Sequence, residues 1–330
     1  MRKPVRLITA GEIKQYYSMK QAIDSMERAF SLLSSGESFV PLRFVSKLPS
    51  NEMMMLFKPA YVEKEKRISL KFLTQRGNCF VPEIPVIQGI VLIIDADTGE
   101  ILSIMDGEYL TALRTGAASG LATRCFARKD ANTLALFGCG AQGRTQMEAV
   151  ACERDIKKAL VFDKNKDRAD LFIREMREKF QIEMVYTSDT SLLSEADIIC
   201  TATSATEPLF KKEVLKRGVH INAIGSFQPH MQELDPWILK DAKVYVDQIE
   251  SCLKESGDFI KPIAQGIFQK SIIVGEIGDF CLNKIAGRES EDEITVFKSV
   301  GIAIQDYTVA TDIYNNSLKN SFGHDINLFE

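Results

Sequence analysis

The chain is poor in the residues on which metal centres and disulfide frameworks depend. Of its 330 residues only three are His and seven are Cys, and no two Cys stand in C-x-x-C spacing. Small secreted domains use paired Cys as crosslinks, and zinc sites use clustered Cys and His. We therefore expect no metal site and no disulfide framework, with a reducing cytoplasm as the default location.

Long hydrophobic runs and an excess of positive charge are also missing. The longest apolar runs are short pieces such as residues 89–94, whereas about 20 residues are needed to span a bilayer. Lys and Arg number 41 against 45 Asp and Glu, so the formal net charge is −4. This composition argues against a broad nucleic-acid surface and against membrane binding. No secretory signal is evident after the basic N-terminus.

The first part of the chain combines one helical pattern with several strand-like runs. Residues 19–33 place apolar side chains at three- and four-residue steps, which predicts a helix. An Ala-rich helix is expected at 111–126, and strands are expected at 39–48, 53–57, 69–74, 88–95 and 101–105. The composition, 45% apolar and 26% charged, suits one large domain or two ordinary ones.

From about residue 128, strands and helices alternate. Strands are expected at 132–137, 158–162, 183–186, 197–202, 219–224 and 243–246, with helices at 141–153, 166–180 and 188–195. Such alternation predicts an α/β fold with a parallel sheet covered on both faces. A helix returns at 302–315. We expect residues 1–127 plus 303–330 to form one domain and 128–302 the other.

The strongest local motif is a G-x-G-x-x-G loop directly after an apolar strand and directly before a helix. It reads Gly138-Cys139-Gly140-Ala141-Gln142-Gly143. Gly138 permits a tight turn, Gly140 lets the backbone approach a pyrophosphate, and Gly143 lets the helix pack on the strand. The helix N-terminus adds free N–H groups and a positive dipole end. The loop therefore predicts a dinucleotide site.

An acidic residue at the end of the next strand indicates which dinucleotide binds. Asp163 closes the run 159–163, where a carboxylate can bind both hydroxyls of the adenine ribose and would repel a 2′-phosphate. NAD(H) is therefore favoured. Lys164 and Lys166 leave NADP(H) open, because either lysine could bind a phosphate.

Three cationic residues of the first part lie in apolar or small-residue surroundings. They are Arg43, Lys71 and Arg114. Each one alone is better explained by a structural ion pair or by an extended side chain whose head reaches water. Together, and beside a nicotinamide site, they favour a small substrate with an α-carboxylate, which an Arg fork binds well.

Four segments resemble the ornithine cyclodeaminase/mu-crystallin family. They are residues 111–118, the loop 138–143, residues 221–225 with 233–236, and residues 299–306. The resemblance covers nearly the whole chain. It implies a Rossmann domain inserted in an α+β substrate-binding domain that forms a homodimer. It also implies NAD(P) and chemistry at the Cα of small amino or imino acids.

The resemblance also implies roles for single residues. Arg43, Lys71 and Arg114 would hold the substrate carboxylate, and Lys71 and Arg114 are the candidate catalytic residues. The dinucleotide would contact the glycines of the loop together with Ala141, Gln142, Asp163, Thr201, Ala202 and Thr203. Ile224 and Gly225 would lie near the nicotinamide, and Gly301 would close that pocket.

One position helps to choose among the reactions of the family. Cyclodeaminases carry an acid two places after the glycine that occurs here as Gly225, but this chain has Phe227, which cannot move a proton. The pattern Ser226-x-x-Pro229 resembles the mu-crystallin and imine-reductase branch. Members of that branch reduce cyclic ketimines such as Δ1-pyrroline-2-carboxylate and Δ1-piperideine-2-carboxylate, which yields L-proline or L-pipecolate.

Several alternatives stay open from the sequence. The protein could be an alanine- or opine-type dehydrogenase, an ornithine cyclodeaminase, or a non-catalytic ligand-binding protein of the crystallin kind. The proton for the imine could come with the substrate, from Lys71, or from a water held by Ser226 or His230. Glu108 is expected in a turn, and Cys139 is expected to pack beneath the loop.

Overall fold

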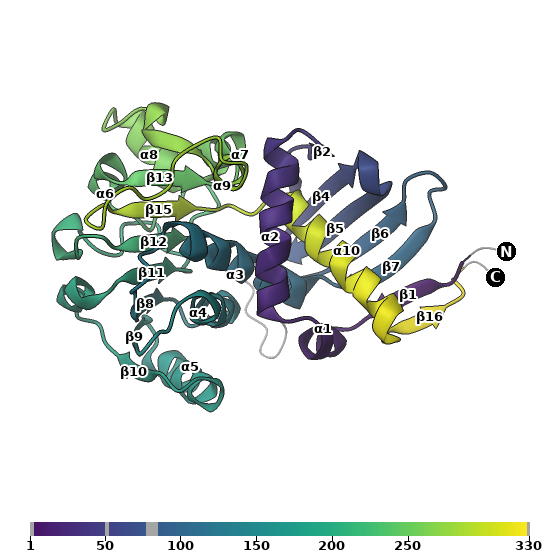
Figure 1. Ribbon diagram of the computed structural model, residues 1–330, viewed down its shortest axis with the longest axis horizontal. Coiled ribbons are helices and arrows are strands. Elements are labelled where there is room, and N and C mark those ends of the chain that lie inside the picture. Colours follow the sequence, from purple (N-terminus) through teal and green to yellow (C-terminus); the bar gives the residue numbers. More distant parts are fainter. Residues whose placement is uncertain (1–2, 50–52, 77–84, 329–330) are drawn as a thin grey trace. The chain divides into compact units, whose positions relative to one another are not determined.

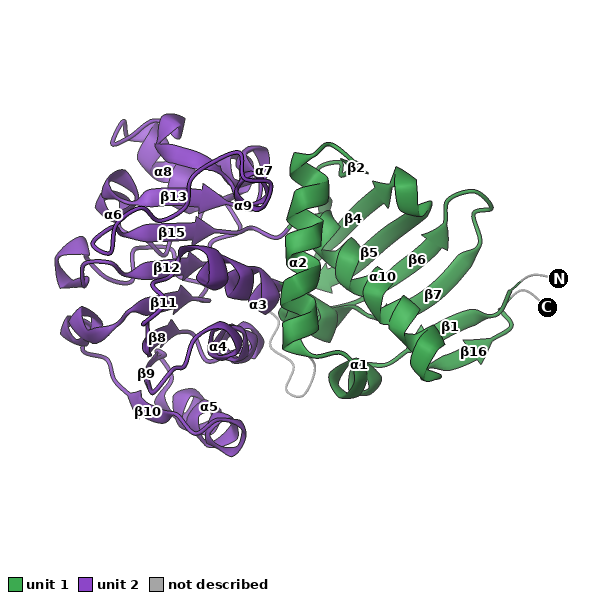
Figure 2. Cartoon of the chain, in the orientation of Figure 1, with its two compact units in different colours: residues 1–114, 302–330 green, residues 115–301 purple. Residues whose placement is uncertain are grey.

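The computed structural model describes residues 3–49, 53–76 and 85–328. The chain divides into two compact units (Figures 1 and 2): unit 1 is Met1–Arg114 with Ile302–Glu330, and unit 2 is Thr115–Gly301. The division lies inside helix α3 (Gly107–Phe126). The predicted domains, 1–127 plus 303–330 and 128–302, keep this helix whole, and their limits stay a prediction.

Unit 1 is built around an eight-stranded sheet. The strand order is β16-β1-β7-β6-β5-β4-β2, and β3 pairs with β4. The strands are β1 (Val5–Ile8), β2 (Ser38–Phe39), β3 (Phe44–Lys47), β4 (Met54–Val62), β5 (Arg67–Gln75), β6 (Ile87–Asp95), β7 (Ile101–Asp106) and β16 (His324–Ile326). A 3-10 turn, η1 (Glu63–Glu65), joins β4 to β5.

Helices cover one face of this sheet. Figure 1 shows α2 (Met19–Ser34) and α10 (Ala303–Asn320) lying across it, with α1 (Ala10–Tyr16) preceding α2. Helix α10 contacts α2 and strands β4, β5 and β6. Strand side chains alternate between the two faces, so every second residue of β4 and β5 is buried beneath the helices.

The opposite face of the sheet is apolar and partly exposed. The strand register places three aligned rows of side chains on it: Phe44, Phe57, Phe72 and Ile90; Pro59, Leu70, Leu92 and Ile104; and Phe39, Tyr61, Ile68 and Ile94. Phe39 is 67% exposed and Phe44 62% exposed. We call these residues the apolar sheet face.

Unit 1 differs from the predicted elements at several places: β1, α1 and β16 were not predicted, β4 is longer than expected, and two differences involve candidate site residues. The strand expected at 39–48 is divided into β2 and β3, with Arg43 in the connection. Helix α3 begins at Gly107, so Glu108 lies in its first turn and the turn predicted there was wrong. Asp106 caps this helix, because its Oδ1 accepts a hydrogen bond of 2.7 Å from the backbone N–H of Tyr109.

Unit 2 contains an eight-stranded parallel sheet of order β10-β9-β8-β11-β12-β15-β13-β14. The strands are β8 (Thr133–Phe137), β9 (Lys158–Phe162), β10 (Glu183–Tyr186), β11 (Ile198–Thr201), β12 (His220–Ala223), β13 (Lys243–Val246), β14 (Ile273–Glu276) and β15 (Thr295–Lys298). Its inner strands are buried on both faces, and two apolar cores lie against them. The Rossmann-type α/β fold predicted from the alternating pattern is confirmed.

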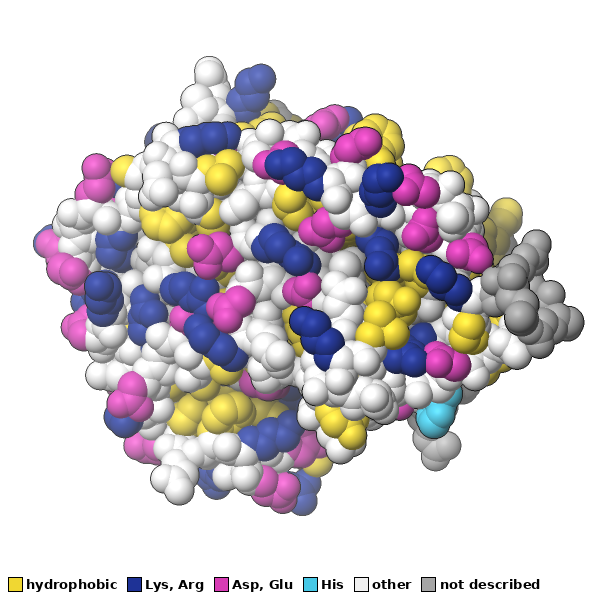
Figure 3. All heavy atoms as spheres, turned by 45° about the vertical axis from the view of Figure 1, so that its right-hand side comes forward, with side chains coloured by type: hydrophobic (Ala, Val, Ile, Leu, Met, Phe, Trp, Pro, Cys, Tyr) yellow, Lys and Arg dark blue, Asp and Glu magenta, His cyan; other side chains and the backbone are white. Residues whose placement is uncertain are grey.

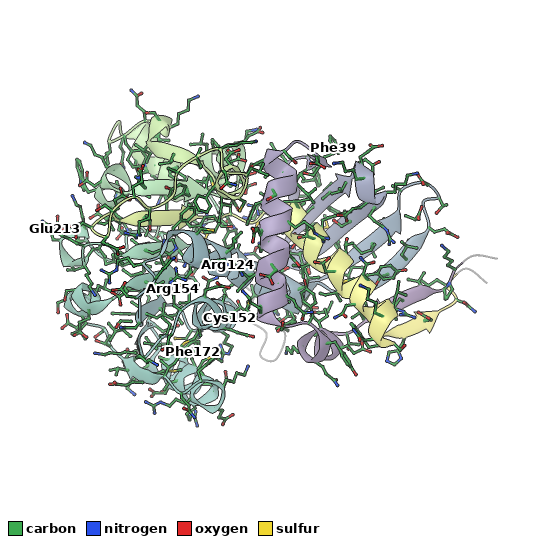
Figure 4. The ribbon with its side chains drawn as sticks, viewed as in Figure 1. Phe39, Arg124, Cys152, Arg154, Phe172 and Glu213 are labelled. Carbon is green, nitrogen blue, oxygen red and sulfur yellow. The ribbon has the colours of Figure 1, made fainter. Side chains whose placement is uncertain are left out.

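Helices connect the strands of unit 2. They are α4 (Ala141–Glu153), α5 (Lys166–Lys179), α6 (Pro236–Asp241), α7 (Ile249–Glu255), α8 (Gly257–Ala264) and α9 (Ile277–Cys281), with 3-10 turns η2 (Thr190–Glu195), η3 (Lys212–Val214) and η4 (Lys270–Ile272). The short helix expected at 188–195 is the 3-10 turn η2. Arg154, just past α4, closes the end of α3, since Nη2 donates to the carbonyl oxygens of Thr123 and Ala127 at 2.8 Å each (Figure 4).

The molecular surface carries charges of both signs. On the face shown in Figure 3, Lys and Arg side chains are interspersed with Asp and Glu, as a net charge of −4 leads one to expect. Exposed ion pairs such as Lys66–Asp97, at 2.7 Å, contribute to this mixture. Within the described parts of the chain, no helix has both the length and the apolar character needed to cross a membrane.

Candidate active site

The segments predicted to bind the dinucleotide meet at one edge of the sheet in unit 2. They follow β8, β9, β11 and β12, whose parallel order puts their carboxyl ends together. Backbone hydrogen bonds of 2.8–3.0 Å join these segments: Gly138 N–H to Phe162, Ala202 N–H to Phe137, and Ile224 N–H to Thr201. The strand order reverses between β8 and β11, which is where open α/β sheets bind nucleotides.

The three glycines of the loop have different reasons to be glycine. Gly138 has φ +98°, and an added Cβ would lie 2.4 Å from the carbonyl oxygen of Ala202. A Cβ on Gly143 would lie 2.1 Å from the carbonyl oxygen of Gly138. Gly140 has an ordinary φ of −81°, and a Cβ there would meet no atom within 4 Å. Its side of the loop is therefore open for a pyrophosphate, which fits a dinucleotide.

Asp163 ties the glycine loop to the end of β9. Its Oδ2 accepts from the backbone N–H of Cys139 and its Oδ1 from that of Asn165, each at 2.8 Å. A carboxylate has further acceptor sites, so Asp163 can also receive ribose hydroxyls. Burial, followed by the charge of Asp163, raises the pKa of the Cys139 thiol to about 12. Cys139 is therefore a packed, protonated thiol beneath the loop.

A buried glutamate that received no role from the sequence holds the nicotinamide side of the predicted site. Glu233 is fully buried and accepts four hydrogen bonds of 2.7–2.8 Å. Their donors are Thr201 Oγ1, Thr203 N and Oγ1, and Gly225 N. One carboxylate thus fixes three of the residues predicted to contact the dinucleotide.

Two further buried carboxylates, which the sequence also left without a role, complete this arrangement. Asp247 Oδ2 accepts from the backbone N–H of Gly301 at 2.8 Å and so fixes this residue at φ +78°. Asp258 Oδ1 accepts from the backbone N–H of Glu233 at 2.8 Å, and its Oδ2 lies 2.9 Å from Lys298 Nζ. The backbone segments expected around the nicotinamide are therefore held by buried charge.

Unit 1 brings the predicted cations together around one carboxylate of α10. Lys71 Nζ donates to Asp306 Oδ1 at 2.6 Å and to Thr111 Oγ1 at 3.1 Å. Arg114 Nε donates to the same oxygen of Asp306 at 2.9 Å. All four side chains are buried. Lys71 and Arg114 therefore form structural ion pairs with Asp306, which is one of the explanations considered for them above.

A fourth cation, missed by the sequence analysis, shares this site. Lys58 is 4% exposed and stands directly opposite Lys71 in the register of β4 and β5. Like charges opposite one another destabilise a sheet. Burial, then the charges of Arg43 and Lys71, hold the pKa of Lys58 well below its ordinary value. The alternation Leu56-x-Lys58-x-Ala60 contained the signal, because it places a lysine in an inward-facing apolar row.

We call Arg43, Lys58, Lys71 and Arg114 the cation cluster. Arg43, half-buried before β3, acts electrostatically on both lysines. Burial lowers the pKa of Lys71 to about 7, and Arg114 and Arg43 also lower it, whereas Asp306 opposes the shift. Two buried cations of the cluster, Lys71 and Arg114, converge on one oxygen of Asp306, and buried cations of this kind can bind an anionic group.

The other residues considered as proton carriers lie in unit 2. Ser226 is buried, and its Oγ donates to the carbonyl oxygen of Met231 at 3.0 Å. His230 is an exposed loop residue. Phe227 packs against the apolar core of the unit. Ser226 and Phe227 therefore make structural contacts, and Lys71 is the titratable group best placed by burial to change charge near neutral pH.

Comparison with known proteins identifies the family of the chain. The sequence model of the ornithine cyclodeaminase/mu-crystallin family matches residues 5–321. A Δ1-pyrroline-2-carboxylate reductase of Bacillus cereus is 38% identical over 327 residues, covering 97% of this chain and 99% of the relative.

Two solved structures resemble the whole chain. The Δ1-pyrroline-2-carboxylate reductase of Thermococcus litoralis, in complex with NADH and L-proline, has a TM-score of 0.92 and 36% identity and covers 98% of this chain and 100% of its own. An archaeal alanine dehydrogenase dimer with bound NAD has a TM-score of 0.90 and 30% identity, with 98% and 99% covered. The chain therefore belongs to the ornithine cyclodeaminase/mu-crystallin family.

Proposed function

We propose that this protein uses NADH to reduce a cyclic ketimine carboxylate, Δ1-pyrroline-2-carboxylate or Δ1-piperideine-2-carboxylate, to L-proline or L-pipecolate. The observation that carries the proposal is the cation cluster, in which the buried Lys71 and Arg114 converge on Asp306, in a chain that also has a dinucleotide loop. The names of the relatives from Bacillus cereus and Thermococcus litoralis support this reaction.

The cofactor would be held by residues of unit 2. The N-terminus of α4 and the open side of Gly140 would bind the pyrophosphate, and Asp163 would bind the adenine ribose. When bound, NADH supplies the hydride that the ketimine carbon accepts. The free thiols of the described residues and the use of NADH suit a reducing cytoplasm, where we place the protein.

The substrate would be held by unit 1. Arg43, Lys71 and Arg114 would bind the carboxylate, with Arg114 as a planar donor and Lys71 as a compact charge. As the carbon is reduced, the π electrons of the C=N bond become the lone pair of the nitrogen. The nitrogen keeps the proton that made it an iminium. The new lone pair then takes a second proton to form the ammonium group of the product, and Lys71, with a pKa of about 7, can donate it at neutral pH.

The test is an assay of the purified protein with Δ1-pyrroline-2-carboxylate and either NADH or NADPH, followed at 340 nm with chiral analysis of the product. We expect one L-proline per NADH oxidised and slower reaction with NADPH. If neither NADH nor NADPH were oxidised, the proposal would be overturned. NADH binding without turnover would indicate a ligand-binding protein. Pyruvate with ammonia should react slowly, and ornithine should release no ammonia because Phe227 replaces the acid.

The activity should depend on pH through Lys71. Since its pKa is about 7, the lysine is charged below this pH and neutral above it. We expect kcat/KM for the ketimine to fall as the pH rises through 7, and this limb should be absent from the Lys71→Met variant. Measurement of both enzymes from pH 5.5 to 9 separates the lysine from the substrate's own ionisation. An identical profile in the two proteins would contradict this role.

Glu233→Gln should weaken cofactor binding. The amide has one oxygen in place of two, so at least one of the buried donors on Thr203 and Gly225 loses its partner. We expect the Kd for NADH to rise about tenfold and the free energy of unfolding to fall by about 2 kcal/mol. Fluorescence titration and urea unfolding measure these quantities. The exposed Glu213 (Figure 4) provides the control Glu213→Gln; equal NADH affinity in both variants would refute the role.

We also propose a homodimer that buries the apolar sheet face of unit 1. An exposed apolar surface of this kind favours association, and the similar archaeal alanine dehydrogenase is described as a dimer.

Light scattering should give twice the chain mass of 37.0 kDa. Phe44→Glu should raise the dimer Kd at least about 100-fold, because a charge would be buried. Trp237→Glu, on an exposed residue of unit 2, should leave the mass unchanged; a monomeric wild-type chain would contradict the proposal.

A further inference from the structure

The first turn of α10 carries two buried polar atoms that have no hydrogen-bond partner among the described residues. Both donors to Asp306, Lys71 and Arg114, bind its Oδ1, and its Oδ2 has no partner. The neighbouring Gln305 accepts from Arg114 Nη1 at 2.7 Å and from the backbone N–H of Ile302 at 3.1 Å through Oε1. Its Nε2 has no acceptor. Adjacent residues thus present one unused acceptor and one unused donor.

An unpaired carboxylate oxygen in the protein interior is costly, and such groups in native structures call for an explanation. Asp306 has no exposed surface. Burial by itself would raise its pKa, but the charges of Lys71, Arg114 and Lys58 outweigh this and lower it. Asp306 therefore stays ionised at neutral pH. Its Oδ2 is an anionic acceptor inside the cation cluster, and it would repel the carboxylate of a substrate.

We propose that Oδ2 of Asp306 accepts the N–H of the substrate's iminium or ammonium group, while Nε2 of Gln305 donates to the substrate's carboxylate. This inference rests on the proposed function. It makes Asp306 a catalytic residue and defines the substrate class as α-imino and α-amino acids that carry an N–H. Ring ethers and N-alkylated iminium acids of the same size would leave Oδ2 unpaired, because their ring heteroatom carries no hydrogen.

The pairing would help the reaction without moving a proton. A protonated imine accepts hydride more readily than a neutral one, and a carboxylate beside its nitrogen favours the protonated form. The N–H proton remains on nitrogen throughout, so Asp306 neither gives nor takes one. Because Asp306 is enclosed, binding requires side chains around it to move. The half-buried Arg43 is the most accessible member of the cluster, and the side chain of Arg114 keeps 5% exposure.

The first test uses the wild-type protein saturated with NADH and measures ligand binding by calorimetry. L-Proline is compared with (S)-tetrahydrofuran-2-carboxylate, which keeps the ring and the carboxylate but has oxygen in place of the N–H. We expect the ether to bind at least about 30-fold more weakly, since a buried acceptor loses its donor. Equal affinities would overturn the proposal. The binding assay needs no turnover. If the protein were inactive but still preferred L-proline, the proposed function would fail while the role of Asp306 would stand.

The second test separates recognition from a purely structural role. In Asp306→Asn, the preference for L-proline over the ether should fall below about threefold, while the ether's own affinity changes little. Asp312→Asn, on the same helix in a 2.6 Å ion pair with Arg28, should keep the wild-type preference. If Asp306→Asn weakened both ligands equally, Asp306 would only position Lys71 and Arg114, and the proposal would fail. If this variant does not fold, the comparison of L-proline with the ether on the wild-type protein still tests the proposal.

Discussion

Arg114→Met is expected to lower kcat/KM for Δ1-pyrroline-2-carboxylate by about 10²–10³-fold. In the structure Arg114 Nε donates to Asp306 and Nη1 to Gln305, so the guanidinium is fixed in one orientation beside Lys71. Removing one partner of a buried charge pair costs about 2–5 kcal/mol, which corresponds to this loss. Steady-state assays at 340 nm with the ketimine at varied concentration measure it.

The cofactor provides the internal control for this variant. Arg114 is not among the residues predicted to contact the dinucleotide, so the Kd for NADH should stay within about twofold of the wild-type value. Arg28→Met, which also removes an Arg from an ion pair with a carboxylate of α10, should keep nearly full activity. An Arg114→Met enzyme within threefold of wild type would show that the cation cluster does not bind the substrate.

Gly140→Val is expected to raise the Kd for NADH by at least about 100-fold while leaving the fold intact. A Cβ at Gly140 meets no protein atom within 4 Å and the backbone has an ordinary φ, so the variant should fold. The added side chain would occupy the open side of the loop, where the pyrophosphate approaches the backbone. NADH fluorescence titration and a thermal melt measure the two quantities.

Gly138→Ala is the matched comparison for this prediction. Its φ of +98° and the 2.4 Å approach of a Cβ to the carbonyl oxygen of Ala202 should destabilise the loop itself. We therefore expect Gly138→Ala to lower both the melting temperature and NADH affinity, but Gly140→Val to lower only the affinity. If Gly140→Val bound NADH with wild-type affinity, the pyrophosphate would not lie against the glycine loop.

The parts of the fold that local patterns describe could be predicted from the sequence. The strand before Gly138 and the helix after Gly143 identify the dinucleotide loop, because each glycine acts within a few residues of its neighbours. The alternating elements after residue 128 predicted the parallel sheet of unit 2. Strands β14 and β15 were missed, although β15 lies between β12 and β13.

The charged contacts of the site could not be predicted in the same way. Asp306 pairs with Lys71 across 235 residues of sequence, and nothing local to either residue indicates the other. Glu233 is a similar case, because its bond to Thr203 depends on two loops that meet only in the folded sheet. Lys58 could have been identified from the sequence, because the alternation of β4 places it on the inward face. A single lysine in a strand is usually exposed, however, so the pattern was not recognised.

A crystal structure of the protein with NADH and L-proline would show whether the cation cluster binds the substrate's carboxylate. We expect the proline carboxylate within hydrogen-bond distance of Arg114 and Lys71, and the proline nitrogen beside Oδ2 of Asp306. Proline bound away from these three residues, with the cluster unchanged, would contradict the account.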